Sequence, residues 1–265
     1  MIPDNHNHFV FSGDPDAMLA AADEEGLDEF AFCEHVFHFT EMLEAEPYFA
    51  RWSKEGPPLP HAEYVARIRD AASCHRVQVR IGVEMDARPD EPEFERRADV
   101  FRAAHGGDWD LVIGSVHVVR GDHSVQDEAI RLTDSEAWDD YFDRLDACAV
   151  AGRYDVIAHP PRLAYTLGDP PASYDARLDR LARAAASAGV ALEVNGNDLQ
   201  RARSMVERMV AACARHGTAI SLGSDAHTPA SVGRVRAGLS MLRDHGIDRV
   251  ARFARRELEL VLLPR

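Results

Sequence analysis

The stretch VQVRIGVEMD, residues 77–86, shows the pattern on which the fold prediction rests. An almost continuous apolar and β-branched run, residues 77–83, ends at two carboxylates, Glu84 and Asp86. Short runs of this kind are typical of parallel strands that helices cover on the outside. Carboxylates at the end of such a strand are therefore candidates for a functional site at the edge of the sheet where the strands end.

The same kind of run recurs along the 265 residues and alternates with amphipathic stretches. Including residues 77–83, seven strands are predicted, at the opening segment 2–9 and at residues 29–33, 111–115, 155–158, 190–194 and 219–222. Strand alternating with helix predicts an α/β fold with a parallel sheet, and seven repeats favour closure into a barrel over an open sheet.

Helix ends are readable between the strands. Asp14-Pro15 and Thr228-Pro229 have the sequence of an N-cap followed by proline, and Ser135 and Ser173 are predicted to begin two further helices. A helix lined by Met209 and Cys213 is expected to end at Gly217. Residues 40–60 carry four prolines and are predicted to form a long loop, which we interpret as a lid.

Composition narrows the class of protein. The net charge is −15, which disfavours nucleic acid and anionic membranes as partners, and no run of apolar residues is long enough to span a membrane. The four cysteines, Cys33, Cys74, Cys148 and Cys213, are scattered and predict no disulfide framework. We expect a cytoplasmic protein without a signal peptide, in which residues 1–265 form a single domain.

Metal-binding residue types follow nearly every predicted strand. In a barrel the ends of the strands converge at one rim, so side chains far apart in sequence are expected to meet there. His6 and His8, two apart in the first segment, point to the same side of a strand. The full set at the strand ends is His6, His8, Glu34, His35, Glu84, Asp86, His117, His159, Glu193, Asn195, Asp225 and His227.

Imidazoles mixed with carboxylates suit zinc, iron or manganese better than magnesium or calcium. The number of candidate ligands exceeds the needs of one ion, so a cluster of two or three divalent metals is predicted. A carboxylate such as that of Glu84 can bridge two ions. Clustered metals polarise phosphoryl oxygens and generate hydroxide at neutral pH, which points to the chemistry of phosphate esters.

The motifs together resemble a known family. His6-x-His8, Glu34-His35, GVEMD, GSVH, Ala158-His159, EVN and GSDAH, in this order, are similar to those of the PHP (polymerase and histidinol phosphatase) superfamily, and within it to bacterial histidinol-phosphate phosphatases. The likeness extends from residue 4 to the C-terminal stretch. It implies a distorted (β/α)7 barrel with a trinuclear metal centre and a water or hydroxide between metals that attacks phosphorus.

The resemblance also implies which residues bind each metal. Asp225 and His227 are in addition assigned catalytic roles. The ligands so implied are His6, His8, Glu84 and Asp225 for the first metal, Glu84, His117 and His159 for the second, and His35 and His227 for the third.

The sequence departs from the family pattern in two places. A further third-metal ligand is usual soon after the His-x-His, and here only Asp14 and Asp16 are available, of which Asp14 is already explained as a helix cap. After the sixth strand, Asn195-Gly-Asn-Asp-Leu-Gln-Arg201 shifts by one position the arginine expected to bind phosphate. The substrate-binding residues implied are Arg162, Ser115 and Arg201.

The favoured function is therefore that of a metal-dependent phosphomonoesterase that converts L-histidinol phosphate to L-histidinol and inorganic phosphate. Two alternatives stay open. One is a PHP phosphoesterase that acts on a nucleotide, cyclic phosphate or sugar phosphate. The other is a metal-binding PHP domain without catalysis.

Overall fold

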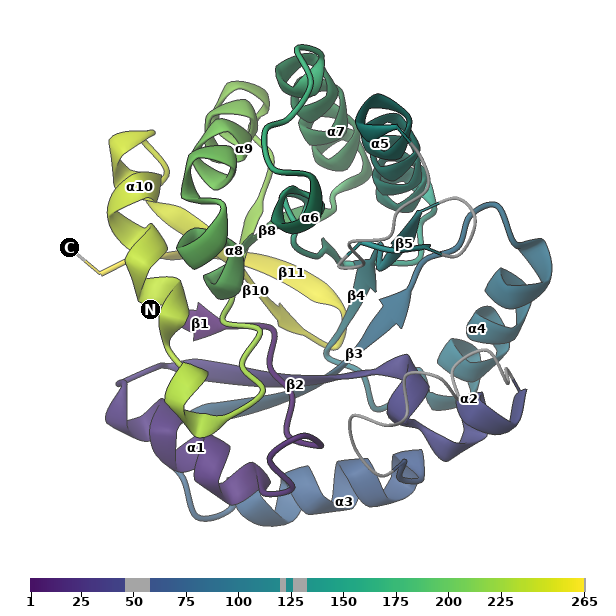
Figure 1. Cartoon of the computed structure of the whole chain (residues 1–265). Coiled ribbons are helices and arrows are strands. Elements are labelled where there is room, and N and C mark those ends of the chain that lie inside the picture. The colour runs from purple at the N-terminus through teal and green to yellow at the C-terminus, as the bar shows by residue number, and fades with distance from the viewer. Residues whose placement is uncertain (46–57, 120–122, 126–132, 265) are drawn as a thin grey trace.

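The computed structural model describes residues 1–45, 58–119, 123–125 and 133–264. Seven strands, each parallel to its neighbour, form a curved wall in the order β1-β2-β3-β4-β7-β8-β9. Helices surround this wall (Figure 1). All seven predicted strands are present, but the first is shorter than the predicted segment 2–9, so that His6 and His8 follow it. The bounds of the seven strands are Pro3–Asp4, Glu29–His35, Gln78–Asp86, Leu111–Ser115, Val156–Ile157, Ala191–Asn195 and Ile220–Gly223.

The two edges of the wall meet beyond the short strand β1. The backbone N–H of Asn5 donates to Leu222 O at 2.7 Å, and that of Asp225 donates to His6 O at 2.8 Å. Asn7 forms a parallel bridge with Ala226. These bonds close the wall where the ladders end, so the α/β barrel expected from the sequence is confirmed in a distorted form.

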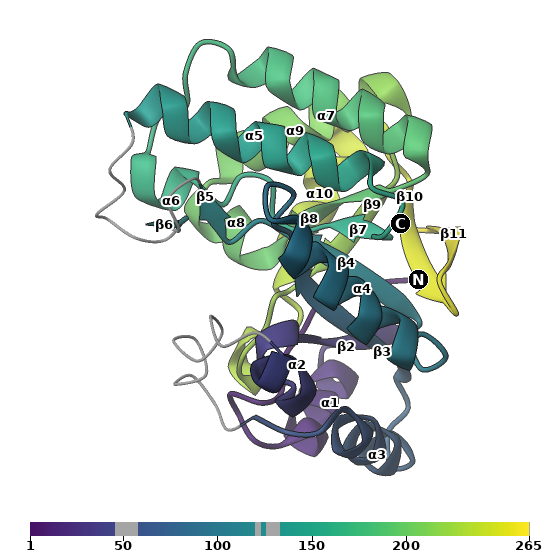
Figure 2. The same cartoon turned by 90° about the vertical axis from the view of Figure 1, so that its right-hand side faces the viewer.

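A C-terminal hairpin was missed by the sequence analysis. Strands β10 (Arg249–Ala254) and β11 (Glu257–Leu262) pair antiparallel, and β10 adds to β9 through Ala251 opposite Ser221. The alternation of glutamate and leucine along β11 is a period-two signal that could have revealed it. Figure 2 shows the hairpin at the end of the barrel that lies opposite α6 and α8.

The tip of this hairpin reaches across the barrel. Arg255 and Arg256 form the turn with positive φ angles of 49° and 64°. The N–H of Arg255 donates to Asp110 Oδ1 at 3.0 Å, and Arg256 Nε donates to Asp155 Oδ2 at 2.9 Å. Both carboxylates lie just before strands, so the hairpin covers the end of the barrel at which the strands begin.

Helices form the outer layer, and their caps agree only in part with the prediction. Asp14 caps α1, and Gly217 ends α9 in the left-handed conformation, as expected. Thr133, with Glu136 in a capping box, begins α5 in place of Ser135. The helix predicted after Thr228 is only a 3₁₀ turn, Pro229–Ser231. The α-helices are Pro15–Glu24, Thr40–Ala45, His61–Ala72, Pro92–His105, Asp134–Val150, Ala164–Leu167, Tyr174–Ala188, Gly196–Arg201, Arg203–His216 and Leu239–Asp244, α1 to α10.

The core has two parts, one between wall and helices and one inside the barrel. The inner part consists largely of small side chains, with Phe253 of β10 as its largest member. Space there is tight, since a Cβ on Gly82 would lie 2.6 Å from Cys33 Sγ and 2.7 Å from Leu111 Cδ2. The barrel interior is therefore filled by side chains, which leaves its rim for a site.

The predicted long loop at residues 40–60 is partly wrong. Its first part is helical, as α2 (Thr40–Ala45), and the proposed lid falls mainly on residues 46–57, outside the described part of the chain. His61, the first residue of α3, is 3% exposed and packs on His105 and Trp109 with ring centroids 3.9 and 4.6 Å away. Aromatic packing between α3 and α4 explains its burial.

Candidate metal centre

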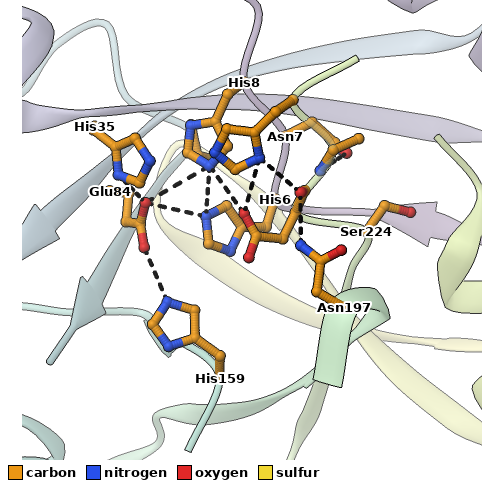
Figure 3. Close-up of polar contacts among 12 residues, drawn as sticks. His6, Asn7, His8, His35, Glu84, His159, Asn197 and Ser224 are labelled. Carbon is orange, nitrogen blue, oxygen red and sulfur yellow. Dashed lines mark hydrogen bonds and ion pairs between the residues drawn. The ribbon is translucent and has the colours of Figure 1, made fainter. Parts of the chain in front are cut away.

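The carboxylate of Glu84, at the end of β3, lies at the centre of the predicted ligands (Figure 3). His35 Nδ1 lies 2.5 Å and His6 Nε2 3.4 Å from Glu84 Oε2. His159 Nε2 and His117 Nε2 lie 3.2 and 3.4 Å from Glu84 Oε1. Four imidazoles from different strand ends thus face one buried carboxylate, as the convergence at a barrel rim requires.

Among the residues that the structure describes, donor atoms gather in three groups, in each of which they lie within 4.8 Å of one another. All eight predicted ligands belong to these groups or, like His159, lie beside Glu84. The first group matches the set implied for the first metal except that Glu84 is missing from it. His35 takes the place of His159 in the second group, and His8 joins the third. The groups are His6, His8 and Asp225, then His35, Glu84 and His117, then His8, His35 and His227.

Unpaired donor atoms test whether a metal fits here. Within the described ranges, Glu84 Oε2, His35 Nδ1 and His159 Nδ1 are buried without a hydrogen-bond partner. Glu84 Oε2 and His35 Nδ1 lie close, but not in hydrogen-bond geometry. Buried polar atoms without partners are costly, and divalent cations would satisfy them. The mix of imidazole and carboxylate donors fits two or three ions of zinc, iron or manganese.

Backbone strain coincides with the same centre. His159 and Asp225 have positive φ angles of 34° and 53°, a region that side chains other than glycine rarely adopt. The other two such residues in the described part of the chain form the hairpin turn. Strain of this kind persists where the surroundings enforce it, and it is concentrated at functional sites. The strain therefore supports a functional role for His159 and Asp225.

Carboxylates behind the imidazoles fix the orientation of the rings. His6 Nδ1 lies 2.8 Å from Glu193 Oε1, and His117 Nδ1 lies 2.7 Å from Asp86 Oδ1. Such pairs hold the Nδ1 proton and leave Nε2 free for a metal. The sequence analysis placed Glu193 and Asp86 among the strand-end ligands, and the structure shows them in this supporting position.

Glu34 plays the same part for His8. Its Oε1 lies 3.3 Å from His8 Nδ1 and 2.8 Å from His38 Nδ1, and its Oε2 accepts from the N–H groups of Phe9 and Val10. The Glu34 carboxylate is completely buried. It therefore ties the end of β2 to the His-x-His segment, a contact that local sequence could not reveal.

The same carboxylates set the charge of the imidazoles. Burial by itself lowers the pKa of His6, but Glu193 and Glu84 raise it well above the usual value. Burial also opposes charging of His117, whose pKa the carboxylates of Asp86 and Glu84 raise to about 10. Without a metal, these rings hold protons at neutral pH, so a metal must displace protons in order to bind.

His8 and His227 differ in charge although their rings are only 4.5 Å apart. Burial opposes the charge on His8, but hydrogen bonds to Asp225 and Glu34 raise its pKa to about 9. Burial, and then the neighbouring charge on His8, lower the pKa of His227 to about 4. His227 is therefore a neutral imidazole that can bind a metal without losing a proton.

A cavity of about 590 Å³ opens over the centre. Phe11, Phe37 and Tyr165 contribute aromatic surface to its lining, which also includes the metal-binding side chains His35, Glu84, His117, His159, Asp225 and His227. Arg162 and Arg201 are the two arginines that line it in the described part of the chain. Arginines, aromatic side chains and metal-binding groups thus line one cavity, which suits a phosphate ester whose alcohol carries a ring.

The three predicted substrate-binding residues lie in different positions. Arg162 is 5% exposed and donates from Nε to Asp198 Oδ1 at 3.1 Å and from Nη2 to Asp225 Oδ2 at 2.6 Å. Arg201 lines the cavity from the end of α8. Ser115 is completely buried, donates to Glu84 and does not line the cavity, so the geometry favours a role in holding Glu84.

Asp14 and Asp16, the residues available after the His-x-His segment as a further ligand of the third metal, do not belong to the centre. Asp14 accepts from the N–H groups of Asp16 and Ala17 as the cap of α1, and Asp16 pairs with His75. Phe11 of the same stretch lines the cavity instead. Asp14 and Asp16 are therefore excluded as ligands by their position, and the third group has only histidines.

A family comparison agrees with this geometry. The model of the PHP domain matches residues 4–197, which include all predicted ligands up to His159. The chain belongs to the PHP domain family. A protein of Deinococcus radiodurans named probable histidinol-phosphatase is 29% identical to this chain over 274 residues, which cover 97% of this chain and 98% of that protein.

Two further proteins are similar to this PHP chain. A probable phosphatase of Shewanella loihica is 25% identical over 238 residues, which cover 88% of this chain and 79% of that protein. The histidinol phosphate phosphatase of Lactococcus lactis, crystallised with zinc, L-histidinol and phosphate, has a TM-score of 0.76 at 22% identity, with 98% of this chain and 100% of that chain covered. This last likeness shows that the two share a fold.

No helix within residues 1–45, 58–119, 123–125 and 133–264 is both long and apolar enough to cross a bilayer.

Proposed function

We propose that this PHP protein is a metal-dependent phosphatase that hydrolyses L-histidinol phosphate to L-histidinol and inorganic phosphate. The observation that carries the proposal is the convergence of four imidazoles on the buried carboxylate of Glu84, beneath a cavity with two arginines. The relative from Deinococcus radiodurans, named a probable histidinol-phosphatase and matched over nearly its whole length, supports the choice of substrate.

The chain's own residues divide the work as follows. Glu84 is the proposed bridging ligand, and Asp225 and His227 are the proposed catalytic ligands, because they reach the cavity from the last strand of the wall. Bound divalent metals would polarise the phosphoryl group and lower the pKa of water towards neutrality. The proposed ligands are His6, His8, His35, Glu84, His117, His159, Asp225 and His227.

Binding of the substrate must overcome the charge of the protein. A phosphate dianion approaches a chain with a net charge of −15, so local cations have to compensate. Arg162 and Arg201 supply positive charge at the cavity, and Phe11 and Phe37 offer an apolar surface to the imidazole ring of the alcohol. The Lactococcus protein of the same fold was crystallised with both products of such a reaction, L-histidinol and phosphate.

We further propose that residues 1–265 act as one cytoplasmic domain. The proposed ligands Asp225 and His227 follow β9, whose end bonds to the opening segment, so the site needs the chain well beyond residue 197. The free cysteines, three of them buried, suit a reducing compartment.

The test is metal analysis of the purified protein followed by a screen for phosphate release. The screen includes histidinol phosphate, a sugar phosphate, a nucleotide, a cyclic phosphate and p-nitrophenyl phosphate. We expect two or three metals per chain and a kcat/KM for histidinol phosphate at least about tenfold above the others, equal to 1.36 kcal/mol in the barrier.

Other outcomes point to the alternatives. If another ester is hydrolysed best, the protein is still a phosphatase but acts on a different class of substrate. The shifted arginine after β8 is the feature that favours this second candidate. Full metal content without release of phosphate from any ester would contradict an enzyme and leave a metal-binding domain.

A further inference from the structure

The two arginines of the cavity have opposite surroundings. The Arg162 guanidinium is buried and is already bonded to Asp198 and Asp225. Arg201 is an exposed residue, and among the described residues no carboxylate pairs with its guanidinium. A phosphate that enters the cavity therefore finds one arginine engaged by two carboxylates and one that is free to bind it.

One aromatic ring contacts both guanidinium groups. Arg201 Cζ lies 4.9 Å and Arg162 Cζ 5.2 Å from the centre of the Tyr165 ring. A guanidinium at this distance is attracted to the face of the ring, and its side chain loses part of its freedom. Tyr165 belongs to α6 and Arg201 to the last turn of α8, so this ring links the helical segments that follow β7 and β8.

The position of the Tyr165 ring is itself fixed. Its hydroxyl donates to Asp198 Oδ1 at 2.5 Å, and the same oxygen accepts from Arg162 Nε. Asp198 is completely buried, and its backbone N–H donates to the side chain of Asn195 at the start of α8. The ring therefore stands on a buried polar network, while its face meets the exposed arginine.

We propose that Tyr165 is a positioning residue that holds Arg201 ready to bind the phosphate group of the substrate. The inference rests on the proposed phosphatase function and adds how its phosphate contact is set. An arginine side chain without such a contact would lose conformational entropy when phosphate binds, and this loss would weaken the affinity for phosphate. Because the Tyr165 ring already orders the Arg201 side chain in the free protein, it lowers KM and does not change the chemical step.

The test compares Tyr165→Leu, Tyr165→Met and Tyr165→Phe with Arg201→Ala in the zinc-loaded protein. Inorganic phosphate is the probe, through its Kd by calorimetry and its Ki against the best ester. We expect Tyr165→Leu and Tyr165→Met to weaken phosphate about tenfold, the scale of a cation–π contact, with kcat and metal content near those of the parent. Tyr165→Phe keeps the ring and should restore most of the affinity.

Two comparisons make the result specific. Tyr165→Leu combined with Arg201→Ala should bind phosphate no more weakly than Arg201→Ala alone, because both changes remove the same contact. Arg208→Ala serves as the matched control. It removes a guanidinium that lies 4.6 Å from the Tyr174 ring on the outer helices, and neither residue lines the cavity, so this variant should match the parent.

The outcomes separate this inference from the proposed function. Additive effects, or Tyr165→Leu and Tyr165→Met with parental phosphate affinity, overturn the role of Tyr165 while the phosphatase stands. If the leucine variant fails to fold, the methionine variant, closer to tyrosine in length, decides the matter. A parent that binds phosphate but hydrolyses no ester overturns the proposed function and leaves the positioning of Arg201 supported or refuted by the same Kd values.

Discussion

Strand β2 begins with Glu29 at one end of the barrel and ends with His35 at the other, and the two ends use buried carboxylates in opposite ways. At the first end, Glu29 is 1% exposed and accepts from Arg80 Nε at 3.0 Å and from Arg252 Nη1 at 2.6 Å. At the second end, Glu84 is equally buried but is surrounded by imidazoles.

The difference between arginine and histidine explains the two outcomes. A guanidinium carries a permanent charge and only donors, so it balances a buried carboxylate within the protein. An imidazole has a titratable nitrogen with a lone pair, and several of them around Glu84 leave donor atoms without partners. At the end rich in arginine, the charge of the buried carboxylate is therefore balanced within the protein. At the end rich in histidine, balance still requires bound cations. Four changes would test this contrast.

The largest effect is expected from Glu84→Gln. The amide cannot bridge two cations, so metal content should fall and phosphatase activity should drop by about 10³-fold or more, equal to about 4 kcal/mol. Circular dichroism should show an intact fold, because the change is nearly isosteric. The matched control is Glu29→Gln at the other end. It should lower the unfolding free energy by about 1–3 kcal/mol and leave metal content unchanged. Equal loss of metal in both variants would contradict the division of the two ends.

Phe253→Ala is expected to do the reverse of Glu84→Gln. Phe253 is 1% exposed and fills the barrel interior from the hairpin. Its truncation should reduce the unfolding free energy by about 3–5 kcal/mol, measured by denaturant titration. Well below the melting temperature, metal content and kcat should stay near those of the parent. A loss of metal in the folded variant would show that the hairpin end also controls the site.

A smaller effect is expected from Glu193→Gln. Glu193 holds His6 Nδ1 at 2.8 Å and accepts from the backbone N–H of His159 at 2.8 Å, so it supports one proposed ligand by its ring and another by its strained backbone. Loss of the carboxylate should weaken metal binding about 10- to 100-fold, measured by competition with a chelator. Unchanged affinity would mean that packing alone orients these rings.

The smallest effect concerns protons. In the metal-free centre the pKa values of His8 and His117 are about 9 and 10, so both imidazoles are charged at pH 7 to 8 and must lose a proton to bind a metal. Metal affinity should therefore rise with pH, by about tenfold per pH unit for each proton released. Calorimetry of zinc binding in buffers of different ionisation enthalpy measures this release. A binding enthalpy that does not depend on the buffer would contradict the raised pKa values.

Much of the site could be predicted because each ligand lies at or just after the end of a strand that the sequence pattern indicates. GVEMD and GSVH combine an apolar run with a ligand type, and parallel strands deliver their ends to one rim, so local pattern and topology together predict the convergence on Glu84. The same reasoning did not find β10 and β11. The glutamate–leucine alternation of β11 was present in the sequence, but the strand–helix rhythm of the preceding residues predicts no hairpin.

Other features depend on contacts between residues far apart in the chain. The barrel decides which distant side chains meet. Its closure brings Glu193 to His6, Arg162 to Asp225 and Tyr165 to Arg201. The sequence by itself determined the strands, the ligand types and the metal chemistry, because these depend on local residue pattern. Only the tertiary structure decided which carboxylates face a metal and which stand behind an imidazole, because hydrogen bonds depend on distances of a few ångströms that closure of the barrel sets.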